Sequence, residues 1–244
     1  TTVNYNRDVE IFPALRAMLE KIQGASPYFS PTDMGVNMAG YCIVDDDAVR
    51  EAANREILRR YYQTAVAEKR SGSDGSQTKK MELMLNRAEI ATTVRPVIAA
   101  AAARAEVSGS PAGALELPDG DIVTGKTTVL LEATAALLLN ALKRLAGIDQ
   151  ETDIISPQAL EPICDLKVRH LHHKNPRLHA DEVLIALSIS STLNADAAKA
   201  LEQLEKLRGC DAHYTVILSR MDEKTHKALG IHATSEPKYE VKPV

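Results

Sequence analysis

The chain has 244 residues, of which 45% are hydrophobic and 25% are charged, and this composition excludes a disordered chain, a collagen-like repeat and a disulfide-stabilised miniprotein. Its 29 Lys and Arg residues against 33 Asp and Glu residues give a net charge of −4, the wrong sign for a protein held to nucleic acid by phosphate contacts. With no Trp and only two Phe, little material exists for stacking bases, so we expect no nucleic-acid partner.

Cysteine usage and the apolar segments indicate the compartment. Cys42, Cys164 and Cys210 are odd in number and widely spaced, a pattern typical of free thiols in a reducing environment. The longest apolar stretch, residues 127–142, contains Glu132 and is shorter than the roughly 20 residues that a membrane-spanning helix needs. No basic leader with an apolar core and a cleavage site is recognisable. We therefore expect a cytoplasmic protein with no membrane partner.

Helical patterns dominate the first part of the chain. Residues 9–22 place apolar side chains at helical spacing, and residues 25–40, with two prolines and two glycines, predict a loop. A helix is expected over 47–70, because acidic residues stand at its start and basic residues at its end, where both complement the helix dipole.

A second helical segment is expected to return antiparallel to this helix. Residues 71–77 form a polar linker, and a helical pattern then covers 78–107, with a kink or break at Pro96. Together these segments predict a long helical hairpin over 47–107, within a mainly helical portion at 1–108.

The portion at 109–244 mixes helices with strands. A turn sequence at 118–121 predicts a β-hairpin, and Asp211 to Ser219 is the clearest strand. The remaining expected elements are helices over 127–146, from 156, from 179 or 180, from 194 to 209 and over 222–229, and an extended segment at 231–234. We therefore predict an α/β fold of the α+β type, in which the helical hairpin precedes a mixed portion.

The segment GDIVTGKT at 120–127 matches the phosphate-loop pattern G-x-x-x-x-G-K-S/T. In that role Gly120 and Gly125 would open backbone N–H groups toward phosphate, Lys126 would contact the terminal phosphates and Thr127 would hold magnesium. The favoured alternative is a β-hairpin that leads into a helix capped by Thr127, because the residues between the glycines read as a strand. Lys126 is a candidate anion contact under both interpretations.

Two other segments carry candidate site residues. Residues 174–182 combine Arg177, which could bind an anionic substrate, with His179, which could act as an acid or base. The alternative for this segment is a loop followed by a helix cap. In the loop before residue 40, Asp33 and Asn37 could orient a substrate, or they could only stabilise turns.

A metal site is not expected. Cys210 and His213 have a spacing that suits a zinc ligand pair, but a structural zinc usually takes four ligands in two close pairs, and no second cysteine pair exists. His170, His172 and His173 lie near an expected helix end, where histidines hydrogen-bond the last carbonyls.

Several blocks of sequence resemble an uncharacterised bacterial family, domain of unknown function DUF1846, also described as UPF0371. These blocks are NYNRDVEIFPAL, SPTDMGVNMAGYCIVDD, TGKTTVLLEATAALLLNALKRLAGI, NPRLHADEVLIALS and LEKLRGCDAH. The resemblance implies that the chain is the C-terminal part of a protein about twice as long, which agrees with a first residue that is not Met. It also implies a preceding nucleotide-binding α/β region with its own glycine-rich stretch. Some members are labelled ATP-dependent peptidases, but no protease signature is found in this sequence.

The leading hypothesis is the C-terminal part of a cytosolic enzyme that acts on a nucleotide or another phosphorylated small molecule, with ATP and magnesium as the candidate cofactors. Lys126 and Arg177 would bind anions, His179 would be the catalytic acid or base, and Asp33 and Asn37 would orient the substrate. Convergence of Lys126, Arg177 and His179 in one pocket would favour this hypothesis.

The alternative is a non-catalytic assembly module. In that case the helical hairpin would form a homo-oligomer and the loops would be structural. An exposed apolar stripe along 57–66 and 81–90 would favour this alternative. We expect a homo-oligomer in either case.

Overall fold

The computed structural model describes residues 5–28 and 46–240, and the chain divides into two compact units, Thr1–Arg95 and Pro96–Val244. The described part of the first unit is helical, whereas the second unit combines helices with a four-stranded sheet, so the predicted α/β fold class is confirmed. Among the described helices, none is both long enough and apolar enough to cross a membrane.

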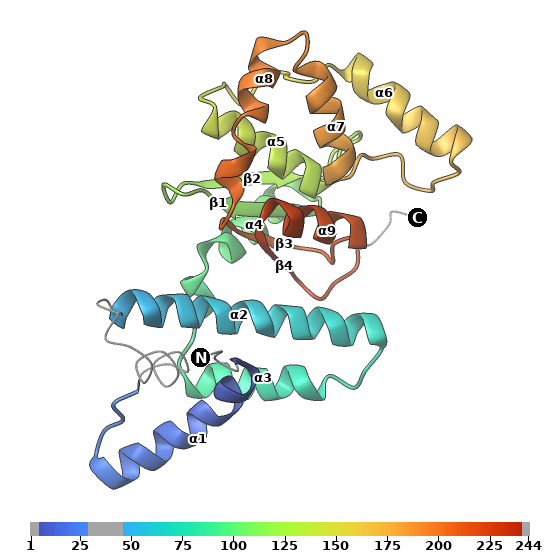
Figure 1. Cartoon of the computed structure of the whole chain (residues 1–244). Helices are drawn as coiled ribbons and strands as arrows, with labels where there is room; N and C mark the ends of the chain where they lie inside the picture. Colours follow the sequence, from blue (N-terminus) through green and yellow to red (C-terminus); the bar gives the residue numbers. More distant parts are fainter. Residues whose placement is uncertain (1–4, 29–45, 241–244) are drawn as a thin grey trace. The chain divides into compact units, whose positions relative to one another are not determined.

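The first unit is built around an antiparallel helix pair. Its described helices are α1 (Tyr5–Gln23), α2 (Asp46–Ser71) and α3 (Ser76–Arg87), so the helices predicted over 9–22 and 47–70 are confirmed. Helices α2 and α3 lie side by side (Figure 1). The residues buried on these two helices include Ile57, Leu58, Tyr62, Val66, Met84 and Leu85.

The carboxylate of Glu68, near the end of α2, stabilises the start of α3. It accepts hydrogen bonds from the backbone N–H groups of Gln77 and Thr78, at 2.9 and 3.0 Å, and from the Thr78 hydroxyl. These N–H groups belong to the first turn of α3 and have no partner within the helix. The contact therefore fixes the direction in which the chain reverses after the polar linker.

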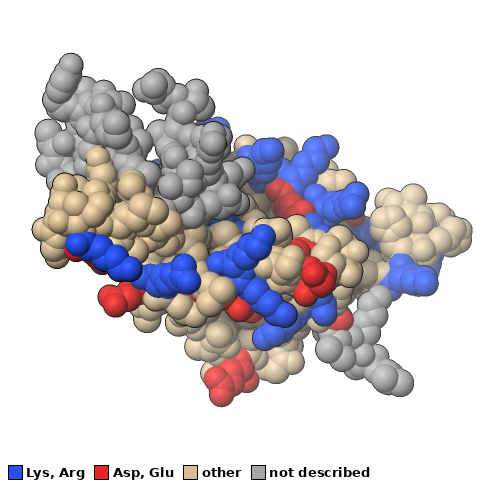
Figure 2. Space-filling view, turned by 90° about the horizontal axis from the view of Figure 1, so that it is seen from below, with Lys and Arg blue, Asp and Glu red and all other residues tan. Residues whose placement is uncertain are grey.

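Charged side chains on the helices are arranged in local pairs. Arg16 pairs with Glu20 in α1, and Arg55 pairs with Glu51 in α2, both at the i, i+4 spacing. Figure 2 shows basic and acidic side chains intermixed on one face of the chain. Pairs of this kind stabilise a helix only slightly, so we ascribe no binding role to them.

The helical segment predicted over 78–107 is two separate helices. Helix α3 ends at Arg87, a 3₁₀ turn (η2) follows at Thr92–Val94, and α4 (Pro96–Ser108) begins at the proline. The break expected at Pro96 is confirmed, because proline fits the first turn of a helix but not its interior. Helix α4 packs against the sheet of the second unit, so it is not the second arm of the expected hairpin.

The sheet has the strand order β2-β1-β3-β4. Strands β1 (Ala112–Glu116) and β2 (Ile122–Lys126) form the predicted β-hairpin, and β3 (Asp211–Tyr214) pairs antiparallel with β1. Strand β4 (His232–Ser235) pairs parallel with β3, after a crossover through α9. The predicted strand at 211–219 is confirmed, although it ends earlier than expected.

Helices cover both faces of this sheet (Figure 1). Ala114 of β1 packs with Val97 and Ala101 of α4, whereas the neighbouring Leu115 belongs to the larger core that contains α5. Successive side chains of a strand point to opposite faces, so α4 and α5 lie on opposite sides of β1. The sheet is therefore buried on both faces at its centre.

Helices α7 and α8 pack against α5 (Ala133–Leu145), which begins later than the predicted residue 127. Asn194 caps α8 as predicted, by accepting hydrogen bonds from the N–H groups of Asp196 and Ala197. The helix expected to reach residue 209 is shorter and is followed by a 3₁₀ turn. The bounds of these elements are α6 Pro157–Asp165, a π-helical turn (η3) Leu166–His170, α7 Ala180–Ser190, α8 Ala195–Leu201, the 3₁₀ turn (η4) Leu204–Leu207 and α9 Arg220–Leu229.

Candidate functional site

The segment that matches the phosphate-loop pattern is a strand. Residues 122–126 form β2, in register with β1, so the hairpin interpretation is the one observed. Gly120 lies in the hairpin turn with φ +87°, a conformation that favours glycine. Gly125 allows β2 to approach α5, because a Cβ atom there would lie 2.3 Å from the backbone nitrogen of Leu137. Both glycines are thus explained by the local structure.

Thr127 does not cap a helix, contrary to the expectation. Its backbone N–H donates to the Pro111 carbonyl at 2.8 Å, and α5 begins only after Glu132, the residue at its N-cap position. The Thr127 hydroxyl is buried and has no hydrogen-bond partner among the described residues. A helix N-terminus therefore does not follow the lysine directly, as it would in a phosphate loop.

Lys126 lines a pocket of about 470 Å³ in the second unit. Arg104 of α4 and Lys143 of α5 also line this pocket. Lys143 donates hydrogen bonds to the carbonyls of Gln150 and Thr152, and burial lowers its pKa. Among the described residues, the buried Nε of Arg104 has no hydrogen-bond partner, and no hydrogen bond or ion pair is found for the Lys126 ammonium. Arg104 and Lys126 therefore line the pocket with hydrogen-bond donors that could bind a ligand.

The rest of the pocket wall is mainly aliphatic. Of the described residues that line the pocket, one is acidic, Asp153, and none is aromatic. Val129 lines the pocket and is 85% exposed, so the apolar wall reaches the surface. The aliphatic lining residues are Val129, Leu130, Leu131, Ala136, Leu139, Ile154, Ile155 and Leu160.

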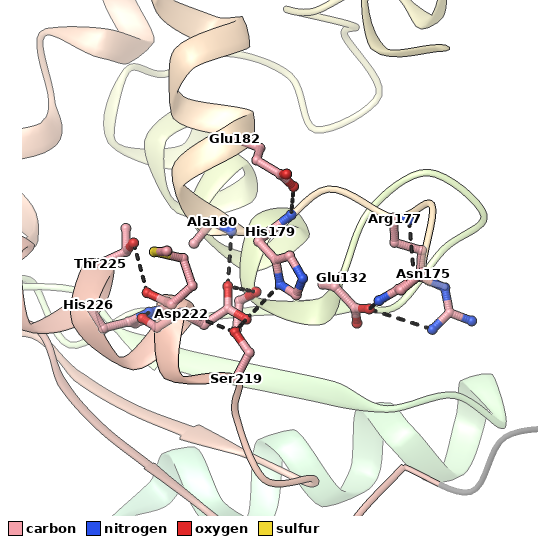
Figure 3. A network of polar contacts seen from close by, with 12 residues as sticks. Glu132, Asn175, Arg177, His179, Ala180, Glu182, Ser219, Asp222, Thr225 and His226 are labelled. Atoms are coloured by element: carbon pink, nitrogen blue, oxygen red, sulfur yellow. Dashed lines mark hydrogen bonds and ion pairs between the residues drawn. The ribbon is translucent and has the colours of Figure 1, made fainter. Parts of the chain in front are cut away.

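His179 lies in a different group of polar side chains, centred on Asp222 of α9 (Figure 3). The Asp222 carboxylate is 4% exposed and accepts a hydrogen bond from His179 Nδ1 at 3.0 Å. It also accepts hydrogen bonds from the Thr134 hydroxyl, the Ser219 hydroxyl and the Ala180 N–H, at 2.8, 2.6 and 3.0 Å. Asp222 thus joins the starts of helices α7 and α9.

This arrangement sets the ionisation of both partners. Burial alone would raise the pKa of Asp222, but the hydrogen bonds from His179, Ser219 and Ala180 outweigh it and lower that pKa to about 2. The hydrogen bond to Asp222 in turn raises the pKa of His179 against the opposing effect of burial. Because an ionised carboxylate only accepts, His179 Nδ1 carries its proton, and Nε2 is the nitrogen that exchanges protons. The ring is 26% exposed, so solvent and solutes can reach it.

The network continues from Asp222 into the core through a second histidine. His226 donates from Nδ1 to the Asp222 backbone carbonyl at 2.8 Å, and its Nε2 lies 2.6 Å from the Tyr214 hydroxyl. Burial lowers the pKa of His226, so the ring is neutral and its Nε2 accepts a hydrogen bond from the Tyr214 hydroxyl. Sequence reasoning did not identify these residues, because Asp222 reads locally as a helix-start residue and Tyr214 as an ordinary strand residue.

Arg177 is held by acidic side chains. Its Nη1 lies 2.8 Å from Glu240 Oε1 and 3.8 Å from Glu132 Oε1, and Asn175 also bonds Glu132 (Figure 3). An anionic ligand at Arg177 would have to displace these carboxylates. Glu182, which accepts from the His179 N–H, is likewise occupied by the Lys167 ammonium at 2.6 Å.

The structure therefore separates the sequence-predicted site residues. Lys126 lines the pocket, whereas Arg177 and His179 are not among its lining residues. The two regions are joined by the segment 128–132, because Leu130 and Leu178 are hydrogen-bonded through their backbones and Leu130 lines the pocket. Asp33 and Asn37 lie outside the described residues.

Neither a metal site nor a reactive thiol is found in the described residues. No group of three or more His, Cys, Asp or Glu side chains in 5–28 and 46–240 could hold a metal ion. Cys164 and Cys210 are buried free thiols, and burial raises the pKa of Cys210 to about 11. His213 contacts the Thr234 hydroxyl, and Cys210 contacts the Lys206 carbonyl.

Known proteins match the chain along nearly its whole length. Residues 1–89 match the family described as domain of unknown function DUF1846, N-terminal, and residues 93–244 match its C-terminal counterpart. A UPF0371 protein of Corynebacterium aurimucosum is 52% identical over 97% of this chain and 48% of its own length. One from Streptococcus thermophilus is 52% identical over 98% and 49%.

The chain spans about half the length of the curated relatives it matches, as the resemblance implied. Its residues match the models of both family domains, so it is not limited to the C-terminal one.

Proposed function

This chain belongs to the DUF1846 family, a domain of unknown function. From the geometry of the site, we propose that the chain is part of an enzyme that acts on a phosphorylated small molecule. The observation that carries this proposal is the pocket at Lys126. Its volume of about 470 Å³ falls within the range of small-molecule sites, roughly 300–1,000 Å³.

Two cations of complementary chemistry support an anionic ligand in this pocket. Arg104 presents a planar guanidinium, whose buried Nε has no partner, and Lys126 adds a compact charge from a different element. Guanidinium and ammonium groups both form strong, charge-assisted hydrogen bonds with phosphate oxygens. A buried donor without a partner is costly, so a phosphate that drew the Arg104 guanidinium into hydrogen bonds would relieve that cost.

His179 is the proposed acid or base. Asp222 fixes the proton on Nδ1 and raises the pKa of the ring, which favours the protonated form, so Nε2 of the partly exposed ring would be the proton donor. The proposal requires substrate to reach from the pocket across the segment 128–132 to this ring. Binding at Lys126 is therefore the first point to test.

The test is thermal unfolding and calorimetric titration of the chain with inorganic phosphate, glucose 6-phosphate and AMP. A ligand at 100 times its Kd should stabilise the folded chain by about 2.7 kcal/mol. We expect this stabilisation to be lost in Lys126→Met, which keeps the aliphatic stem, and to be kept in Lys224→Met, which removes an exposed charge of α9. Equal stabilisation of both variants, or none in the parent chain, would overturn the proposal.

The assembly-module alternative has less support. The stripe that would favour it, along 57–66 and 81–90, is largely buried at Ile57, Leu58 and Met84, although Leu83 is 59% exposed. A homo-oligomer stays a prediction, which light scattering coupled to size exclusion would test.

A further inference from the structure

We infer that the ligand of the Lys126 pocket is a soluble, single-chain aliphatic monophosphate rather than a nucleotide. This inference rests on the proposed function, because it takes the phosphate subsite at Lys126 and Arg104 as given. It adds the chemical nature of the rest of the ligand and the number of phosphate groups.

The aliphatic residues of the pocket wall determine the apolar part of the ligand. The leucine, isoleucine, valine and alanine side chains named above line the pocket, and an alkyl chain gains affinity from such a surface by leaving water. A nucleobase gains most of its affinity from stacking on aromatic or guanidinium planes. None of the described lining residues is aromatic, and the guanidinium of Arg104 is assigned to the phosphate, so the pocket offers more favourable contact to an alkyl chain than to a base.

The charges at the pocket fit a single phosphate group. Lys143 is held by the Gln150 and Thr152 carbonyls, and its charge is further balanced by the nearby carboxylates of Asp149, Glu151 and Asp153. Arg104 and Lys126 are the remaining cations in the lining of the pocket. Two positive charges match a phosphate monoester, which carries close to two negative charges at neutral pH. A triphosphate would bring more charge than these groups balance.

The mouth of the pocket indicates how the chain enters. Val129 is 85% exposed yet lines the pocket, whereas Leu139 is buried at 8% exposed. An aliphatic surface thus runs from solvent to the interior of the second unit. A single flexible chain can follow it, with the phosphate held by the two cations.

The experiment titrates the chain with inorganic phosphate, AMP, butyl phosphate, hexyl phosphate and hexanol by calorimetry. Each buried methylene should tighten binding about fourfold, so hexyl phosphate, with two more methylenes, should bind about fifteenfold tighter than butyl phosphate and also tighter than AMP. Lys126→Met should weaken both alkyl phosphates by the same factor. Ala136→Leu, which fills the pocket, should abolish the dependence on chain length while keeping the affinity for inorganic phosphate.

The outcomes separate this inference from the proposed function. If AMP binds as tightly as hexyl phosphate and Lys126→Met weakens both, the inference fails and the proposed function stands. If hexanol binds as tightly as hexyl phosphate and Lys126→Met has no effect, the phosphate subsite itself is refuted, and with it both proposals. If Ala136→Leu does not fold, the comparison of butyl with hexyl phosphate on the parent chain tests the inference, and equal affinities would overturn it.

A membrane lipid carries the same chemistry, so a further arm distinguishes the source. The chain is sedimented with phosphatidylcholine vesicles that contain phosphatidic acid. We expect no co-sedimentation. Co-sedimentation that hexyl phosphate abolishes would overturn the assignment to a soluble ligand.

Discussion

The Asp222→Asn substitution removes one negative charge from the junction of helices α7 and α9 while keeping the shape of the side chain. The carboxylate is 4% exposed and accepts hydrogen bonds from His179, Thr134, Ser219 and the Ala180 N–H. Asparagine approximates the protonated acid, because it is neutral and its amide nitrogen donates where the carboxylate only accepts. The variant therefore measures what the charge contributes to stability.

The magnitude follows from the pKa of Asp222. Its value falls from 3.8 to about 2 on folding, and this difference corresponds to about 2 kcal/mol of unfolding free energy. Because the folded pKa is the lower one, this stability is fully present above the ordinary pKa of 3.8. It is lost as the pH falls through about 2. The parent chain should exceed Asp222→Asn by about 2 kcal/mol at neutral pH, and the difference should shrink below pH 4.

Urea unfolding of the parent chain and the variant at pH 7, 4 and 3 would measure this difference. The matched control is Asp165→Asn, because Asp165 is 60% exposed and its one ion pair within the described part of the chain is with the exposed Arg169. The control should differ from the parent chain by less than about 0.5 kcal/mol. An Asp222→Asn variant as stable as the control at pH 7, or a difference that does not change with pH, would refute the reasoning.

Three further predictions follow from single residues. Gly125→Ala places a Cβ 2.3 Å from the backbone nitrogen of Leu137, so it should cost about 3 kcal/mol or more in urea unfolding; an unchanged midpoint would show that α5 does not lie on β2. His179→Ala should destabilise the chain more at pH 6 than at pH 9, because the raised pKa of His179 gives stability that is lost as the pH rises through its folded value; equal losses would contradict this. Cys210, with its pKa raised to about 11, should react with iodoacetamide far more slowly in the folded chain than in urea, as measured by mass spectrometry, and fast labelling of the folded chain would count against its burial.

Local signals in the sequence predicted most of the individual elements. The end of α2, the break at Pro96, the hairpin at 118–121 and the cap at Asn194 all depend on residues that are close together in the chain. Proline geometry, dipole complementarity and side-chain caps act within one or two helical turns, so they can be read without the fold. Family membership could also be inferred from the sequence, because several separate blocks of residues resemble those of the family.

Contacts between distant residues were decided only by the tertiary structure. The letters GDIVTGKT fit a phosphate loop, but Gly125 is needed for the approach of α5 to β2, which no local pattern reveals. His179 and Asp222 are separated by 43 residues, and their hydrogen bond exists because α7 and α9 begin at the same place in the fold.

What the sequence determined by itself was the fold class and the start of most helices, which follow from local periodicity, turn chemistry and composition, and the family, which follows from the blocks that resemble it. The tertiary structure alone decided that Lys126 faces an aliphatic pocket with Arg104, and that Arg177 is balanced by Glu132 and Glu240. The sequence shows which side chains carry a charge. Whether that charge is available to a ligand depends on which distant groups surround it, and only the packing of the chain sets those neighbours.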